Sequence, residues 1–223
     1  METAARGALL KICGIVHADD LRACAALGVD AVGLNLWPQS PRGRSVAHHA
    51  RLLERAGDLG ETRRVGVFVE PARRLVQEAR RALGLDLVQY HQDRLPPYAP
   101  DEGPYVWVLR GRLDPLAEGL PDPPPAWILF DSRVAGYGGA GVLADWRAAR
   151  RLVERVAPVP VLLAGGITPD NAAAALSAVR PAGLDVASGA EAPGAPPGRK
   201  DPRRVAALVR ACKSHRNVAG TKP

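Results

Sequence analysis

The 223-residue sequence lacks several features that would assign it to a particular class of protein. Its three cysteines, Cys13, Cys24 and Cys212, are widely spaced and form no CxxC pair, which argues against a disulfide framework or a zinc site. No apolar run reaches the length of a membrane helix, and the first residues carry no apolar stretch suited to a secretory signal. We therefore expect a cytoplasmic protein with no membrane segment and no metal. For Cys24 and Cys212 we expect buried positions in helix packing.

The sequence also has no basic tail and no cluster of basic residues interleaved with aromatic ones, although its net charge is +7 and its pI is near 9.8. The basic residues are mostly arginines spread over several helix-like segments, for example at 73–74, 80–81, 150–151 and 203–204. This distribution is typical of solvated helix faces. Attraction of a small anionic substrate explains the charge more simply than nucleic-acid binding does.

The sequence alternates between two patterns. Continuous apolar runs, typical of parallel strands covered on both faces, occur at 9–15, 31–36, 64–69, 85–91, 105–109, 126–131, 159–164 and 183–187. Apolar residues at helical spacing occur at 19–27, 47–56, 72–83, 145–156, 170–179 and 202–213. Thr168 and Asp201 each precede a proline, which predicts two helix N-caps.

Eight strands in alternation with helices predict an α/β fold, a single (β/α)8 TIM barrel over residues 1–223, with flexible ends at 1–7 and 215–223. The proline-rich stretches 93–104 and 111–125 indicate that the fourth and fifth helices are short or irregular. An open doubly wound sheet is the alternative, but the first turn, at 13–17, does not match GxGxxG.

Two glycine-containing turns follow the last two predicted strands. Gly165 and Gly166 end one apolar run, and Ser188 and Gly189 follow the next. Glycine lets backbone N–H groups approach a ligand closely, and in a barrel the turns after strands seven and eight often bind phosphate.

The ends of the other strands supply the candidate reactive groups. Cys13 is either a small buried residue or a thiolate that acts as a base or nucleophile. Lys11 lies on the same face of its strand, which in a barrel is the interior. Asp131 is either a helix cap or turn residue, or a general acid. Arg42 is either a surface arginine or a fork for a substrate carboxylate, whereas we interpret His91 as structural support.

These motifs resemble, in order and over nearly the whole chain, those of phosphoribosylanthranilate isomerase. The matching segments are Lys-Ile-Cys-Gly at 11–14, Ser-Pro-Arg at 40–42, Val-Gly-Val-Phe-Val at 65–69, Val-Gln-Tyr-His at 88–91, Asp131 with a glycine loop ending in Asp-Trp at 145–146, Leu-Ala-Gly-Gly-Ile at 163–167 and Ser-Gly-Ala-Glu at 188–191.

The resemblance implies an Amadori rearrangement of N-(5-phosphoribosyl)anthranilate in tryptophan biosynthesis, without metal or organic cofactor. It implies Cys13 as the general base, Asp131 as the general acid and Arg42 as the ligand of the anthranilate carboxylate. Backbone N–H groups around residues 165, 166, 188 and 189 would hold the phosphate of this phosphosugar. The family includes monomers and homodimers, so both states stay open.

Two departures keep an alternative open. The family's glycine loop usually has Lys and Phe where this chain has Val142 and Ala144. A catalytically impaired barrel that only binds a phosphosugar is therefore the second hypothesis. Indole-glycerol-phosphate synthase and a pentose-phosphate epimerase are weaker ones, because their catalytic lysines or metal-binding histidines have no counterpart pattern here.

Overall fold

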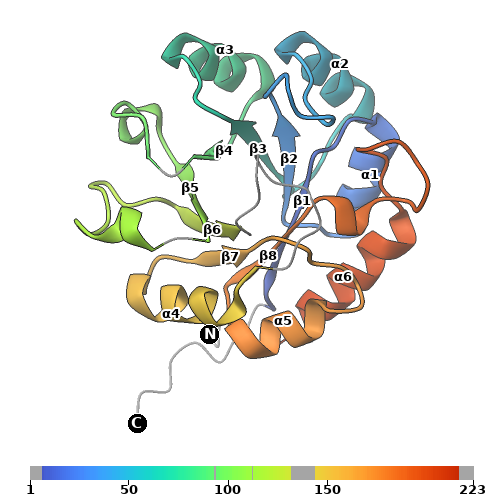
Figure 1. Cartoon of the computed structure of the whole chain (residues 1–223). Helices are drawn as coiled ribbons and strands as arrows, with labels where there is room; N and C mark the ends of the chain where they lie inside the picture. The colour runs from blue at the N-terminus through green and yellow to red at the C-terminus, as the bar shows by residue number, and fades with distance from the viewer. Residues whose placement is uncertain (1–6, 93, 112, 132–143, 216–223) are drawn as a thin grey trace, which may run out of the picture.

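A computed structural model describes residues 7–92, 94–111, 113–131 and 144–215 of the chain. Eight parallel strands close into a barrel in chain order, with β1 paired to both β2 and β8 (Figure 1). The strands are β1 (Leu9–Cys13), β2 (Ala31–Asn35), β3 (Arg63–Phe68), β4 (Leu87–Tyr90), β5 (Tyr105–Arg110), β6 (Trp127–Asp131), β7 (Val161–Leu163) and β8 (Gly183–Val186). The predicted barrel and its eight strands are confirmed.

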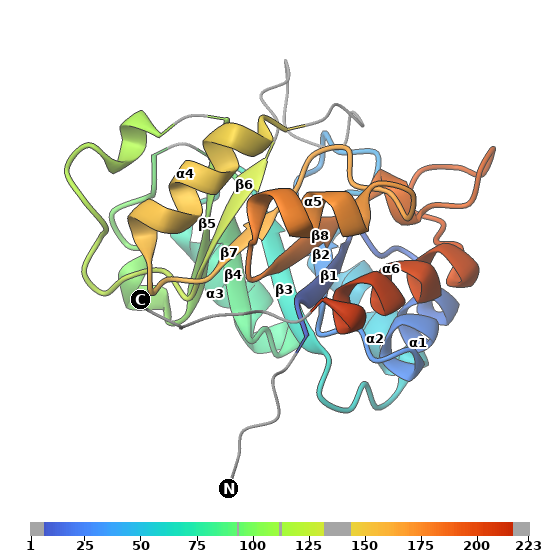
Figure 2. The same ribbon diagram turned by 90° about the horizontal axis from the view of Figure 1, so that it is seen from below.

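Helices form the outer layer of the barrel. In the described part of the chain they are α1 (Ala18–Ala26), α2 (Val46–Ala56), α3 (Arg73–Leu83), α4 (Trp146–Val156), α5 (Ala172–Val179) and α6 (Pro202–Ser214). Figure 2 shows α4, α5 and α6 lying side by side over the strands. After β4 and β5 the described residues form only the 3-10 turns η1 (Pro100–Glu102) and η2 (Asp114–Leu116), as the proline content predicted.

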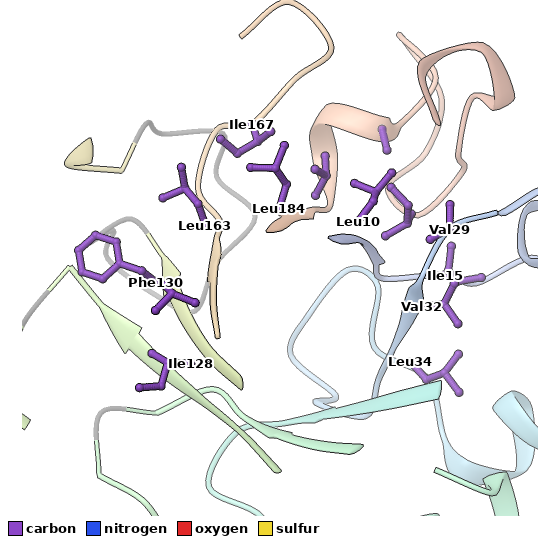
Figure 3. Packing of buried hydrophobic residues seen from close by; sticks show 14 of the residues in the cluster. Leu10, Ile15, Val29, Val32, Leu34, Ile128, Phe130, Leu163, Ile167 and Leu184 are labelled. Atoms are coloured by element: carbon purple, nitrogen blue, oxygen red, sulfur yellow. The ribbon is translucent and has the colours of Figure 1, made fainter. Parts of the chain in front are cut away.

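Two buried clusters follow from the two-residue period of the strands. One set of strand residues points outward against the helices, including Leu10, Val32, Leu34, Phe130 and Leu163 (Figure 3). The alternate residues point inward and fill the barrel; those of the inner cluster are Ala31, Val65, Leu87, Val106, Val108, Trp127, Leu129, Leu162 and Ala164. Lys11, Cys13 and Asp131 have the inward parity, so their strands direct them toward the barrel axis.

The two predicted N-caps have different outcomes. The side chain of Asp201 accepts a hydrogen bond from the backbone N–H of Arg203 at 2.8 Å, and α6 begins at Pro202. The prediction for Thr168 is wrong, because α5 begins only at Ala172. Asn171 accounts for the delay: its Oδ1 accepts from the N–H of Thr168 at 2.9 Å, and its Nδ2 donates to the carbonyl of Gly166 at 2.9 Å. This small loop holds the chain out of the helix for three more residues.

Some predictions concern residues outside the described ranges. They include the flexible ends, apart from Gly7 and His215, and most of the glycine loop with Val142. Within the described residues, no helix combines the length and the hydropathy needed to cross a membrane.

Candidate active site

The carboxyl ends of the strands surround one pocket. All seven residues that the sequence predicted for the site line it: Cys13, Arg42, Asp131, Gly165, Gly166, Ser188 and Gly189. They come from β1, β6 and the loops after β2, β7 and β8. A closed parallel barrel brings all strand ends of one kind to the same rim, which is why segments far apart in sequence meet here.

The Cys13 thiol lies at the end of β1 and is 9% exposed, so it reaches the pocket while being surrounded by protein. Burial raises the pKa of this thiol above its ordinary value, because the apolar surroundings disfavour the thiolate. The positive charges of Lys11 and Lys200 act in the opposite direction. Cys24 and Cys212 are buried in α1 and α6, as predicted, and burial raises the pKa of each to about 12.

Lys11 is fully buried inside the barrel and forms an ion pair with Asp185, with Nζ 2.6 Å from Oδ1. The two residues are direct partners in the β1–β8 register, and both point inward. Burial alone would lower the pKa of Lys11, but the negative charges of Asp185 and Cys13 raise it, so the ammonium stays charged. Asp185 also lines the pocket.

Asp131 ends β6 and lies beside His91, with 3.5 Å between Oδ2 of the aspartate and Nε2 of the histidine. Burial, with the charges of Arg110 and Lys11, lowers the pKa of His91 to about 4. The imidazole is therefore neutral near pH 7. His91 is anchored by a backbone hydrogen bond of 2.8 Å to Phe68, and its neutral ring supports the carboxyl group without adding a charge.

Arg42 forms a bidentate pair with Glu191, in which Nε and Nη2 donate to the two carboxylate oxygens at 2.6 and 2.8 Å. Lys200 joins the same carboxylate at 3.2 Å, and the N–H of Gly198 donates to it at 2.8 Å. Burial acts to raise the pKa of Glu191, but the hydrogen bond from Arg42 and the two positive charges lower it. This network ties the loop after β2 to the loop after β8 and fixes the guanidinium at the pocket wall.

The two glycine turns lie against each other. Gly165 and Gly166 have φ angles of +85° and +65°, a region open to glycine at little cost. A Cβ on Gly189 would lie 1.8 Å from the carbonyl oxygen of Ile167, so only glycine permits this approach. Ser188–Ala190 form a single 3-10 turn after β8. Backbone from both turns thus lines one side of the pocket.

Sequence reasoning missed Asp185, Glu191 and Lys200 as parts of the site. Asp185 carried a signal, because it is an isolated carboxylate within the apolar run of β8 and Lys11 needed a partner. Glu191 lies in the Ser-Gly-Ala-Glu segment that carries the resemblance, but that segment indicated only its backbone, as a phosphate site. Lys200 stands between two other charged residues, so its local sequence does not single it out. Among the described residues, no group of three or more His, Cys, Asp or Glu side chains is placed to hold a metal ion.

The Cys13 thiol, the Asp131 carboxyl group, a fixed arginine and the main chain of the two glycine turns line one pocket at the mouth of this barrel. Such a site defines a (β/α)8-barrel enzyme that performs acid–base chemistry on a small anionic molecule.

Comparison with known proteins places the chain within this class. Residues 10–211 match the family model described as N-(5′-phosphoribosyl)anthranilate (PRA) isomerase. The chain therefore belongs to the N-(5′-phosphoribosyl)anthranilate isomerase family.

Individual relatives agree with the family model. The isomerase of Myxococcus xanthus is 41% identical over 212 residues, which cover 92% of this chain and 96% of the relative. That of Pseudomonas aeruginosa is 39% identical, covering 93% and 96%. Among solved structures, phosphoribosyl anthranilate isomerase from Thermus thermophilus superposes with a TM-score of 0.76 at 29% identity, covering 92% of this chain and 98% of that one.

A further solved isomerase contains reduced 1-(o-carboxyphenylamino)-1-deoxyribulose 5-phosphate. It matches this chain with a TM-score of 0.74 at 25% identity, covering 93% of this chain and 99% of that one.

Proposed function

We propose that the pocket performs the isomerisation of this family with Cys13 as general base and Asp131 as general acid. The family activity is an Amadori rearrangement in tryptophan biosynthesis, and the substrate we propose is N-(5′-phosphoribosyl)anthranilate. The observation that carries the two roles is the convergence of the Cys13 thiol and the Asp131 carboxyl group on the same pocket, each at the inward-facing end of its strand.

The chemistry needs only these two groups. Asp131, in its protonated form, gives a proton to the furanose ring oxygen, and the bond from this oxygen to C1 breaks as the anilino nitrogen forms a C=N iminium. The iminium acidifies C2. The Cys13 thiolate then takes the C2 proton, and the released electron pair forms the C1=C2 bond of an enolamine. Movement of a proton from the C2 hydroxyl to C1 gives the ketone, so substrate and product are isomers.

Arg42 is the proposed ligand of the anthranilate carboxylate. Glu191 accepts hydrogen bonds from Nε and Nη2, and it thereby fixes the plane of the guanidinium at the pocket wall. The planar fork carries further N–H donors, which suit a second carboxylate. The backbone of residues 165–166 and 188–189 is the proposed phosphate site, on the side of the pocket where the two glycine turns meet.

The location and the oligomeric state of the protein are further predictions. A cytoplasmic location and a monomeric or homodimeric state remain predictions, since both are compatible with this pocket. The excess of positive charge favours approach of a phosphosugar that carries two anionic groups, a phosphate and a carboxylate.

Kinetics of Cys13→Ala and Asp131→Asn test the assignment. We expect each substitution to lower kcat by roughly 100- to 10,000-fold, the range over which a positioned acid or base contributes. Cys212→Ala is the matched control, since it removes a buried thiol of α6 that does not line the pocket, and its kcat is expected to stay near that of the unchanged protein. Circular dichroism checks that each variant folds.

Near-full activity in either variant would show that the role assigned to that residue is wrong. If the unchanged protein binds the reduced product analogue but does not turn over substrate, the impaired-barrel hypothesis holds instead. Complementation of a tryptophan-requiring strain that lacks the isomerase gives an independent readout of the same question.

A further inference from the structure

Burial of the Lys11–Asp185 ion pair inside the barrel costs desolvation free energy. Both charges leave water, and a buried pair of this kind often stabilises a protein no better than well-packed apolar side chains. Lys11 is 0% exposed, and its ammonium lies 2.6 Å from the carboxylate on the neighbouring strand. Stability alone therefore does not account for the pair, and its position points to the thiol two residues along β1.

Gly33 shows how closely the ammonium and the thiol approach. This residue faces Cys13 in the β1–β2 register. A Cβ added to Gly33 would lie 2.7 Å from the Cys13 sulfur and 3.2 Å from the Lys11 nitrogen. Both atoms thus occupy the space that a side chain on β2 would fill. The Lys11 ammonium donates a hydrogen bond to Asp185, and its positive charge also acts on the Cys13 thiol.

We propose that Lys11, held in place by Asp185, stabilises the thiolate of Cys13 and is the positioning residue for this base. The inference rests on the proposed role of Cys13 in the isomerisation. When the thiol loses its proton to solvent, the adjacent ammonium balances the new negative charge. Asp185 keeps the ammonium charged in spite of its burial and prevents it from turning away from the sulfur.

Other charged groups face the thiol from neighbouring loops, but they are committed elsewhere. Lys200 donates to Glu191 at 3.2 Å and to the carbonyl of Ala187 at 3.0 Å. Arg42 is paired with Glu191. Asp185 itself opposes the thiolate, yet the positive charge of Lys11 acts on Cys13 more strongly than this carboxylate does. His91 faces Lys11 and is neutral near pH 7.

The test compares Lys11→Met/Asp185→Asn with the unchanged protein. The double variant removes both charges, so it leaves no unpaired charge in the barrel and folds where Lys11→Met alone could fail. Cys13 is alkylated with iodoacetamide between pH 7 and pH 9, and peptide mass spectrometry separates its rate from those of Cys24 and Cys212. We expect alkylation of Cys13 to be about tenfold slower in the double variant at each pH, because less thiolate is present.

Isomerase kinetics provide a second readout. We expect kcat of the double variant at pH 7 to fall about tenfold and to recover as pH rises. A higher pH increases the fraction of Cys13 present as thiolate, which compensates for the missing ammonium. A pair that only stabilised the barrel would give unchanged Cys13 alkylation and a kcat deficit that pH does not rescue. That result would overturn the proposal.

Lys200→Met is the control for charge alone. Lys200→Met removes one positive charge near the pocket, whereas the double variant leaves the net charge unchanged. If only net charge mattered, Cys13 alkylation would therefore slow more in Lys200→Met than in the double variant. We expect the reverse order, and an equal or larger slowing in Lys200→Met would contradict a specific role for Lys11. Because alkylation does not require turnover, this test stands apart from the Cys13→Ala test of the catalytic role.

Discussion

Cys13, Cys24 and Cys212 carry the same thiol but differ in what surrounds it. Cys24 and Cys212 lie in helices, where burial raises the pKa to about 12 and leaves the groups inert. Cys13 is also buried, but an ammonium and a pocket adjoin it. At the scale of the residue, an adjacent positive charge and contact with the pocket distinguish a cysteine that can act as a base from one that only packs in the core.

Arg42 provides a prediction at the same scale. We expect Arg42→Ala to raise KM roughly ten- to hundredfold with a smaller effect on kcat, because charge-assisted hydrogen bonds are worth about 1.5–3 kcal/mol and this contact does not touch the reacting carbons. Arg44→Ala is the control: Arg44 lies in the same loop, donates to the carbonyls of Pro41 and Gly43, and does not line the pocket. Steady-state kinetics measure both variants. An unchanged KM for Arg42→Ala would exclude Arg42 as the ligand of the anthranilate carboxylate.

At the scale of the element, the period of each strand decides which side chains point into the barrel and which point toward the helices. The two-residue period of β1 sends Leu10 and Ile12 to the helical layer and Lys11 and Cys13 to the interior. β6 does the same with Phe130 outward and Asp131 inward. A shift of one residue in the register of either strand would remove its reactive group from the pocket.

Helix α6 allows a test of a predicted cap. Asp201→Ala removes the hydrogen bond to the N–H of Arg203, and we expect the free energy of unfolding to fall by about 1 kcal/mol. Asp170→Ala serves as the matched control, because Asp170 is exposed and α5 begins beyond it at Ala172. We expect a change within about 0.5 kcal/mol there. Urea denaturation measures both variants, and equal losses would contradict the difference between the two helix starts.

Barrel closure acts at the scale of the whole molecule. It places β8 beside β1, so Asp185 meets Lys11 across 174 positions of sequence. It also brings the loops after β2 and β8 together through Arg42 and Glu191, which are 149 positions apart. Neither contact exists until the last strand has joined the first, so assembly of the pocket depends on complete closure.

The stability of the whole molecule is expected to depend on pH through its buried histidines. Burial lowers the pKa of His49 to about 4, and His49 Nε2 lies 3.0 Å from the carbonyl of Asn35. Since the unfolded chain takes up a proton near pH 6.5 and the folded one only near pH 4, stability from this residue is complete above pH 6.5. It is lost progressively as pH falls toward 4.

We therefore expect the free energy of unfolding of the unchanged protein to fall by about 3 kcal/mol more than that of His49→Gln between pH 7 and pH 4. His48→Gln, which removes an exposed neighbouring imidazole, is the control and is expected to follow the unchanged protein. Urea unfolding at the two pH values measures the difference. Parallel curves for His49→Gln and the unchanged protein would contradict the effect of burial.

Much of the architecture follows from the sequence alone. Eight apolar runs and six amphipathic segments were enough to predict the barrel, because burial on both faces imposes a pattern that each strand carries locally. Cys13, Asp131 and Arg42 could be singled out since barrel chemistry lies at the carboxyl ends of strands. Helix α5 was placed less accurately, because the Asn171 loop depends on a contact with the carbonyl of Gly166 that no propensity describes.

Only the tertiary structure decided how charges pair. A charged lysine that points into a barrel needs a partner of opposite charge, and Lys11 has this position in the sequence pattern. That the partner is Asp185 follows only from the β1–β8 register. Likewise, Arg42 meets Glu191 because two distant loops close over one rim. The physical reason is that hydrophobic periodicity acts between near neighbours in sequence and can be recognised there, whereas electrostatic pairing inside a barrel depends on distances that exist only after closure.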